Sequence, residues 1–374
     1  MAETVIGRHP GSNCLRARVF TVPAESTEAD ATLTWDTTTV VTVQADRDDV
    51  EGLGWTYSSP AAATLIEHHI APSLADHDLL DVAGCFAAML HACRNLGATG
   101  LVMQAISAVD IALWDLRSRL WDVPLQVVLG GAAGAAVPVY GSGGFVNLSS
   151  VALDNQIARW LQLGCRAVKI KIGGPAEVHQ AHDLSRLEQV RYSAGPDVAI
   201  MVDANGWYSR GEAVRVGAEL DRFGVTWFEE PVSSDDPRGL AAVRDRVQAD
   251  VSAGEYICTL DGALALCRSV DCLQLDVTRC GGYTGWLRCA AVALAHHLPV
   301  SAHCAPALHA QLAGVVPHLR HVEWFADHVR VDGQLFSGTT APVDGLLSPR
   351  PAAGHGMRVG AGAGRFETAD RGLW

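Results

Sequence analysis

VKIKIG (residues 168–173), MVDANG (201–206) and WFEEP (227–231) are short apolar runs that each end in charge, glycine or proline. Such runs recur about every 25 residues from residue 137 onward, with amphipathic stretches typical of helices between them. Eight runs alternating with helices predict an α/β fold, a parallel (β/α)7-8 TIM-like barrel. We expect its strands at Val137–Gly141, Ala167–Ile172, Ala199–Val202, Trp227–Phe228, Val251–Ala253, Cys272–Leu275, Val300–Ala302 and His321–Trp324. We expect its helices at Leu153–Leu163, Ala176–Ser193, Ser209–Phe223, Arg238–Gln248 and Thr284–His296.

The chain before the barrel has a different pattern. Thr37–Ala45 is rich in β-branched residues and predicts a strand. Apolar spacing predicts helices at Pro60–Leu74, Asp81–Asn95 and Gln104–Trp121. Residues 1–35 are polar and predict an irregular segment with a mobile loop, and the Gly- and Pro-rich part from Gly338 also predicts irregular structure. We therefore expect an α+β unit at 1–130, the barrel at 131–340 and a C-terminal segment at 341–374 that returns to the first unit.

Charge and composition exclude several classes of partner. The 374 residues carry a formal net charge of −13 and no lysine/arginine cluster, which argues against nucleic-acid and anionic-membrane partners. No apolar run is long enough to span a bilayer and no secretion signal is visible, so we expect a cytoplasmic protein. An acidic substrate would then need a local cation to attract it. The ten cysteines form no CxxC pair and predict buried residues rather than disulfides, with Cys304 set apart because it follows His303.

Three acids follow consecutive strands. Asp203, Glu229 and Glu255 are each separated by 26 residues, one βα unit. Catalytic groups of βα-barrels come from the carboxyl ends of several strands, so these carboxylates should converge. A hard divalent cation would relieve their repulsion, and oxygen ligands favour Mg²⁺. Alternatively, each acid caps the helix that follows it, a reading that three acids in register disfavour.

Candidate bases stand at other strand ends. Lys169 and Lys171 alternate along one strand, so both side chains point to the same side. A neighbouring ammonium and a metal would lower a lysine pKa toward the value that a general base needs. His303 follows Asp276 by one βα unit, and a carboxylate that accepts from one imidazole nitrogen fixes the tautomer. The alternatives are a solvated lysine pair and a structural histidine.

Six motifs together resemble the enolase superfamily, specifically its mandelate racemase subgroup. The resemblance extends roughly from Asp110 to Glu323, and it implies that the N-terminal α+β unit is the family's capping domain. The motifs are VKIKIG, MVDANG, WFEEP, AGEY (253–256), QLDVTRCGG-TGW (274–286) and SAHCAP-LH (301–309).

The resemblance implies a role for each matching residue. Asp203, Glu229 and Glu255 are similar to the Mg²⁺ ligands of the family. Lys171 resembles the base on one face of the substrate, and His303, held by Asp276, the acid or base on the other face. The remaining implied substrate contacts are Lys169 to the carboxylate, Glu323 as hydrogen-bond donor to the developing enediolate, and Asn205.

Two bases permit more than one reaction from one enediolate. We expect dehydration of a sugar acid, a small-molecule carboxylate, to a 2-keto-3-deoxy acid. Racemisation or epimerisation and lactone cycloisomerisation are alternatives, and a sugar-acid binding protein without turnover is a further one. We expect specificity in a lid segment, Thr21–Trp35, and in loop residues such as Ser142 and Tyr256. The resemblance also implies a homo-oligomer, a dimer or an octamer.

Overall fold

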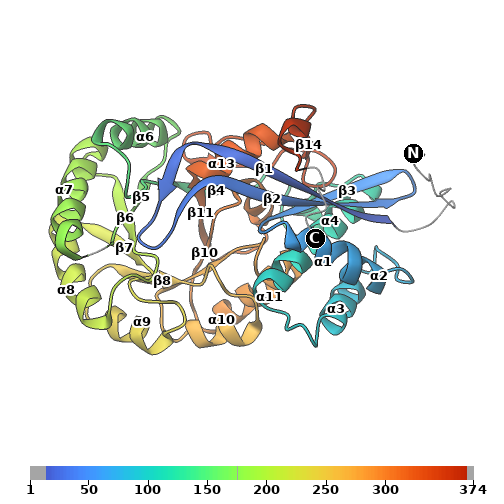
Figure 1. Cartoon of the computed structure of the whole chain (residues 1–374), viewed down its shortest axis with the longest axis horizontal. Helices are drawn as coiled ribbons and strands as arrows, with labels where there is room; N and C mark the ends of the chain where they lie inside the picture. Colours follow the sequence, from blue (N-terminus) through green and yellow to red (C-terminus); the bar gives the residue numbers. More distant parts are fainter. Residues whose placement is uncertain (1–13, 175, 369–374) are drawn as a thin grey trace.

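The computed structural model of the chain describes residues 14–174 and 176–368, without the side chains of 176–180. Figure 1 shows a barrel ringed by helices and, beside it, a unit of strands and helices from the first third of the chain. Among the described residues, no helix combines the length and apolar content needed to cross a bilayer.

The barrel consists of eight parallel strands in sequence order, and the pairing of its last strand with its first closes it. Each predicted strand is confirmed within a few residues, because each is an apolar run buried between the barrel interior and the outer helices. The strands are β4 Val137–Gly143, β5 Ala167–Lys171, β6 Ala199–Asp203, β7 Val225–Glu229, β8 Asp250–Ala253, β9 Cys272–Leu275, β10 Val300–Ala302 and β11 Leu319–Phe325. The helices are α6 Ser150–Gln162, α7 Ala176–Ala194, α8 Arg210–Leu220, α9 Pro237–Arg244, α10 Leu260–Leu266, α11 Gly282–Ala295, α12 Pro306–His309 and α13 Ala326–Leu335.

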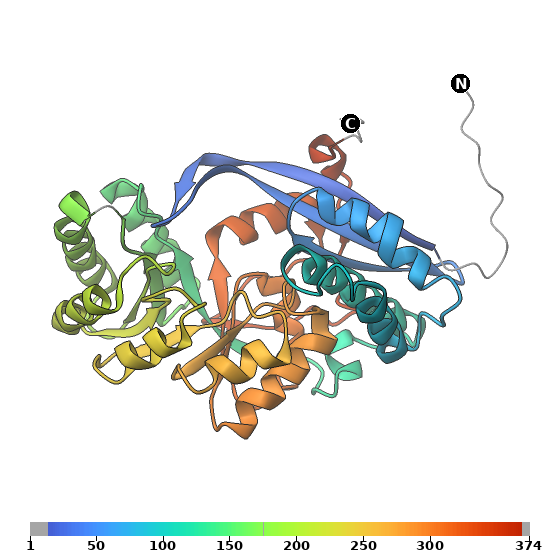
Figure 2. The same ribbon diagram turned by 60° about the horizontal axis from the view of Figure 1, so that its bottom comes forward.

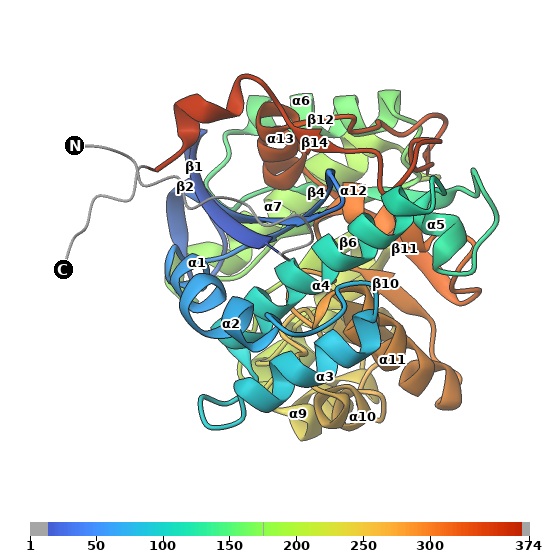
Figure 3. The same ribbon diagram turned by 90° about the vertical axis from the view of Figure 1, so that its right-hand side faces the viewer.

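The N-terminal unit is an antiparallel sheet of β1 Cys14–Ala29, β2 Thr34–Arg47 and β3 Val50–Tyr57, packed against helices. The helices are α1 Ala61–Leu65, which continues through a π-turn into α2 Ala71–Ser73, α3 Val82–Ala92 and α4 Gly100–Leu120. Gly54 lets β3 approach α4 closely, since a Cβ there would lie 2.1 Å from the Ala108 carbonyl oxygen. Figure 3 shows α4 running beside α11 of the barrel, where Trp114 Nε1 donates to Thr284 Oγ1 at 3.0 Å.

The predicted irregular segment at residues 1–35 is wrong for its described part. Residues 14–29 form the long strand β1, paired with β2 and interrupted by a bulge between Pro23 and Glu28. β1 is an edge strand, so its Pro23 and its polar second half are tolerated, while residues 15–22 (LRARVFTV) alternate polar and apolar side chains as a strand does. Pairing with β2, which local composition does not encode, makes that second half a strand. Figure 2 shows the β1–β2 hairpin extending over the barrel. Residues 1–13 lie outside the described part.

The C-terminal segment contacts both units. Its short strands are β12 Phe336–Ser337, β13 Leu346–Leu347, which pairs with β4, and β14 Arg358–Val359. The buried His355 Nε2 lies 2.7 Å from the Leu53 carbonyl oxygen, and Arg18 donates to the Glu367 carboxylate at 2.6 Å. The division of the chain at residues 130 and 340 stays a prediction.

Candidate active site

The carboxyl ends of the barrel strands gather buried ionisable side chains around one cavity. The cavity has a volume of about 290 Å³. Lys171, Asn205, Glu255, His303 and Glu323 line its floor and walls. The side chains that the sequence places at strand ends are all nearly inaccessible to solvent: Lys169, Lys171, Asp203, Glu229, Glu255, Asp276, His303 and Glu323.

The N-terminal hairpin covers this cavity. Asp30, Leu33 and Trp35 lie at or near the turn between β1 and β2, and all three line the same cavity as the strand-end groups. Trp35 packs edge-on against Phe145 at 5.5 Å between ring centroids, and its Nε1 donates to Glu28 at 2.9 Å. Part of the predicted lid segment Thr21–Trp35 therefore lies over the barrel mouth.

The three acids converge as the register predicts. One carboxylate oxygen each of Asp203, Glu229 and Glu255 lies within 4.8 Å of the other two. The pKa of Glu229 is raised to about 8, because burial and the Asp203 carboxylate disfavour its charged form. Glu255 Oε2 is buried without a hydrogen-bond partner among the described residues. Three crowded carboxylate oxygens of this kind suit a hard divalent cation such as Mg²⁺.

The two lysines are bound to these acids. Lys171 Nζ pairs with Asp203, while Lys169 Nζ lies 2.6 Å from Glu229 Oε2 and 2.9 Å from Glu323 Oε1. Burial lowers the pKa of Lys171, but the Asp203, Glu255 and Glu229 carboxylates together outweigh it and hold that pKa above its ordinary value. The lowered lysine pKa expected from the sequence is therefore not found, because the carboxylates favour the charged form of Lys171.

His303 is held in a fixed orientation. Its Nδ1 lies 2.8 Å from Asp276 Oδ2, and Asp276 Oδ1 accepts from the Thr278 amide and hydroxyl at 2.7 Å. Its Nε2 faces the cavity, 3.3 Å from Glu255 Oε2. Burial lowers the pKa of His303, but Glu255 and the hydrogen bond with Asp276 outweigh it and raise that pKa. Because Asp276 occupies Nδ1, Nε2 is the ring nitrogen of His303 that can contact a ligand in the cavity.

Glu323 and Asn205 complete the predicted set. Glu323 accepts from the Ser142 hydroxyl at 2.6 Å and from the Cys304 amide at 2.8 Å. Burial raises the pKa of Glu323, but Lys169 and His303 outweigh it and hold that pKa well below its ordinary value. Asn205 lies in the left-handed region at φ 45°, and its Oδ1 is buried without a hydrogen-bond partner among the described residues.

The sequence reasoning missed two charged groups at this site. Arg279 Nη1 lies 3.1 Å from Glu255, and its Nε lies 3.5 Å from Asp276. The spacing Asp276-x-x-Arg279 behind a strand end was the available signal. Glu230 is a fourth buried carboxylate, and burial together with Glu255 raises its pKa far above the ordinary value. The doubled Glu of WFEEP was its only signal.

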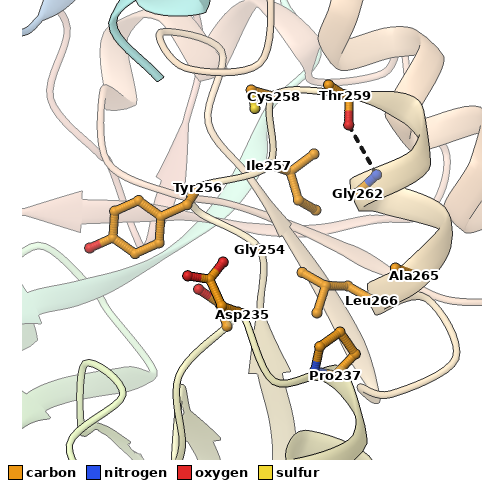
Figure 4. Close-up of a pocket in the computed structure, with 11 residues that line it drawn as sticks. Asp235, Pro237, Gly254, Tyr256, Ile257, Cys258, Thr259, Gly262, Ala265 and Leu266 are labelled. Carbon is orange, nitrogen blue, oxygen red and sulfur yellow. Dashed lines mark hydrogen bonds between the residues drawn. The ribbon is translucent and has the colours of Figure 1, made fainter. Parts of the chain in front are cut away.

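A second cavity adjoins the first at the loop after β8. Figure 4 shows this cavity, of about 300 Å³, with Asp235 and Tyr256 on one side and Ile257, Thr259 and Leu266 on the other. Tyr256 lines both cavities and is 57% exposed, and the Arg279 guanidinium lies 5.1 Å from its ring centroid. Tyr256 thus forms part of the wall between them.

A closed βα-barrel with acids, lysines and a carboxylate-held histidine at its strand ends, covered by an α+β unit, defines a barrel enzyme of the capped type. The chain belongs to the mandelate racemase/muconate lactonizing enzyme family of the enolase superfamily. Residues 16–130 match the mandelate racemase/muconate lactonizing enzyme N-terminal domain, and residues 152–362 match the enolase C-terminal domain-like family. The predicted family and the predicted barrel with a capping domain are therefore confirmed.

Related sequences are enzymes that act on sugar acids. L-talarate/galactarate dehydratase of Salmonella typhimurium is 32% identical over 288 residues, which are 74% of this chain and 71% of that protein. 3,6-anhydro-alpha-L-galactonate cycloisomerase of Streptomyces coelicolor is 31% identical over 320 residues, 83% of this chain and 86% of that protein. The chain is accordingly an enzyme, as the sequence predicts.

Solved structures agree with this assignment. A mandelate racemase/muconate lactonizing enzyme-like protein from Rubrobacter xylanophilus superposes with a TM-score of 0.92 at 40% identity, covering 96% of this chain and 100% of that one. A racemase from Streptomyces coelicolor A3(2), solved with bound magnesium, superposes with a TM-score of 0.89 at 29% identity, covering 96% and 100%. Mg²⁺ is thus consistent both with the family and with the cluster of three acids.

Proposed function

We propose that the protein is a Mg²⁺-dependent dehydratase that converts a sugar acid to a 2-keto-3-deoxy acid. The observation that supports this most is the placement of two acid–base groups on different strands of one cavity. Lys171 comes from β5 and His303 from β10, with β4 and β11 between them around the barrel. A substrate bound at the carboxylate cluster is then within reach of a base and of a separate acid.

The strand-end groups divide the work of the reaction. Asp203, Glu229 and Glu255 would hold the ion, which when bound would supply positive charge where negative charge develops on the substrate carboxylate. Lys171 removes the α-proton, which requires that it first give up the proton that the surrounding carboxylates hold on it, and Lys169 contacts the substrate carboxylate. His303, as its imidazolium, donates a proton to the β-hydroxyl so that it leaves as water. Removal of the α-proton and loss of hydroxide from the β-carbon leave an enol that tautomerises to the 2-keto acid.

Two further residues contact the substrate. Asn205 offers a buried, unpartnered Oδ1 to a substrate hydroxyl. Glu323 donates a hydrogen bond to the developing enediolate, which requires that it first take up a proton. Lys169 is the main group that holds the pKa of Glu323 below its ordinary value. Glu323 therefore takes up a proton when the Lys169 ammonium leaves it and pairs with the substrate carboxylate instead.

Isomerisation is the second candidate function. The 3,6-anhydro-alpha-L-galactonate cycloisomerase, whose match spans 83% of this chain, supports an isomerising outcome from the same enediolate. Non-catalytic sugar-acid binding is a third possibility, and it predicts no exchange of the substrate α-proton with solvent.

A screen of mono- and diacid sugars with Mg²⁺ tests the proposal. A dehydratase yields a 2-keto product that semicarbazide traps, and in D₂O it incorporates deuterium at the former β-carbon, where the enol takes up its proton. A racemase or epimerase exchanges the α-proton in D₂O without forming a 2-keto product. A protein that binds a sugar acid and neither exchanges the α-proton nor forms a product contradicts every enzymatic reading.

A further inference from the structure

A second group of metal-type ligands lies beside the carboxylate cluster. His303, Cys304 and Glu323 each offer one donor atom, and these three atoms lie within 4.8 Å of one another. The Cys304 Sγ is 3.3 Å from His303 Nε2, which is 4.0 Å from Glu323 Oε2. All three side chains are buried, and all three line the active-site cavity. The donors therefore converge on one point that a small ion can reach from the cavity.

The backbone after β10 brings two successive side chains together. Neighbouring residues of a strand point to opposite faces, so His303 and Cys304 should diverge. Instead, Cys304 and Ala305 lie in the left-handed region at φ 49° and 39°. Non-glycine residues there cost roughly 1–3 kcal/mol each and persist only where neighbours hold them. The Ala305 amide donates to His328 Nδ1 at 3.2 Å, and the Cys304 carbonyl lies 2.9 Å from His309 Nδ1.

The ligands have the outer contacts that metal ligands have. Metal-binding histidines commonly donate their other ring nitrogen to a carboxylate, as His303 Nδ1 does to Asp276 at 2.8 Å. Ligating carboxylates are in turn hydrogen-bonded. Glu323 Oε1 accepts from the Ser142 hydroxyl at 2.6 Å and lies 2.9 Å from Lys169 Nζ. The side chains of His303 and Glu323 are therefore held in place before an ion binds.

The donor set selects the kind of ion. One sulfur, one imidazole nitrogen and one carboxylate oxygen suit borderline-soft cations and not Mg²⁺. Tetrahedral zinc, with bonds near 2.3 Å to sulfur and 2.05 Å to nitrogen, sets these atoms roughly 3.6 Å apart. The observed Sγ to Nε2 distance of 3.3 Å lies close to that value.

We infer that His303, Cys304 and Glu323 form a second cation site, which binds a thiophilic divalent ion of the Zn²⁺ or Cd²⁺ class and blocks turnover. The bound ion occupies His303 Nε2, the atom that the proposed reaction needs for proton transfer. Its fourth position faces the cavity. Binding releases the thiol proton of Cys304 and any proton on Nε2. Glu255 Oε2, 3.3 Å from Nε2, borders both cation sites, so Mg²⁺ at the carboxylates weakens this binding by repulsion without abolishing it.

Titration of the full chain with Cd²⁺, with and without saturating Mg²⁺, tests the site. Thiolate bound to Cd²⁺ gives an ultraviolet charge-transfer band, whereas Cd²⁺ at the three carboxylates gives none. We expect one equivalent of this band in the native chain and its loss in Cys304→Ala. Cys258→Ala is the matched control, because Cys258 is partly exposed and lines cavities outside the active site. This readout does not depend on the proposed reaction.

A second variant keeps the site testable if Cys304→Ala does not fold. His303→Asn keeps the thiol, and its band should need at least about tenfold more Cd²⁺, since even outer contacts of metal ligands are worth about 10–100-fold in affinity. A native chain without the band overturns the proposal. So does a band that Cys304→Ala retains, or one that His303→Asn leaves at unchanged affinity.

Discussion

At the scale of single residues, the lysines of this chain are confined to the site. Lys169 and Lys171 are the only lysines in the 374-residue sequence, and every other basic side chain apart from histidine is arginine. Both lie on β5, are buried and are paired with the acids of the carboxylate cluster. Lysine differs from arginine in that its pKa responds readily to its surroundings when it is buried, and here the carboxylates raise the pKa of Lys171. Their scarcity elsewhere makes them direct probes of the site.

Mg²⁺ binding should be visible at these two residues. A chain labelled with ¹³C at lysine Cε should give two resonances, one for each lysine. Mg²⁺ should shift both, because the ion takes carboxylate oxygens of Asp203 and Glu229 away from the ammonium groups. Asp203→Asn should weaken the response, and K⁺ at matched ionic strength should give none. Two resonances that stay in place at high Mg²⁺ would refute the proposed metal site.

Removal of either acid–base group should abolish most turnover. Lys171→Ala and His303→Asn should each lower kcat/KM on the identified substrate by about 10²–10⁴-fold, the usual contribution of a positioned acid or base. In a dehydratase, His303→Asn should still exchange the α-proton in D₂O, because Lys171 remains. His297→Asn, an exposed histidine at the end of α11, is the control. Full activity of both site variants would disprove the mechanism.

At the scale of elements, the β1–β2 hairpin brings the N-terminal unit to the active-site cavity. Trp35 closes part of the cavity by packing on Phe145, which follows β4. Trp35→Ala should raise KM more than it lowers kcat, because it removes contact area and leaves the acid–base groups intact. Trp121→Ala, half-exposed at the end of α4, is the control and should leave both constants unchanged. An equal loss of kcat and kcat/KM would place Trp35 in the chemical step instead.

The free energy of unfolding should depend on pH because of Asp110, which lies where α4 contacts α11. Asp110 is fully buried, accepts from the Thr284 amide at 3.0 Å and has a pKa raised to about 7 by burial. Because the folded state holds this proton more tightly than the unfolded state, the stabilisation is complete below about pH 4 and is lost as the pH rises through 7. Asp110→Asn should therefore remove up to roughly 4 kcal/mol of this pH dependence. Denaturant unfolding of the native chain and of Asp110→Asn at pH 5 and pH 8 measures the free energy of unfolding. The same pH dependence in both chains would contradict this expectation.

At the scale of the whole molecule, one carboxylate joins three parts of the chain. Asp115 on α4 accepts from the Leu53 amide at 2.9 Å, from Arg119 at 2.6 Å and from the His355 amide at 2.7 Å. β3, α4 and the C-terminal segment therefore meet at this side chain. Its removal leaves buried donors without an acceptor.

Asp115→Ala should lower the free energy of unfolding by about 3–5 kcal/mol, the usual cost of breaking a buried ion pair. Denaturant unfolding followed by tryptophan fluorescence measures it. Asp76→Ala, at an exposed position, is the control and should change that free energy by no more than about 0.5 kcal/mol. A loss as small as that of the control would show that water replaces the lost contacts.

The amino-acid sequence by itself determined the barrel and most of the predicted site. Apolar runs at regular spacing encode strands, and a closed parallel barrel places all their carboxyl ends on one face. Asp203, Glu229 and Glu255 could therefore be brought together from their numbers alone. The same reasoning paired Asp276 with His303.

Only the tertiary structure decided the rest. Residues 15–22 (LRARVFTV) carry a polar–apolar alternation that local sequence could have revealed, whereas the polar second half of β1 is a strand only because β2 pairs with it. Cys304 meets His303 because two residues adopt left-handed backbone angles that their side-chain types do not announce. Arg279 meets Glu255, and Asp115 meets Leu53 and His355, across segments distant in sequence. Periodicity records which face of an element is buried, whereas the atoms that meet across elements are fixed only when the barrel closes and the N-terminal unit packs against it.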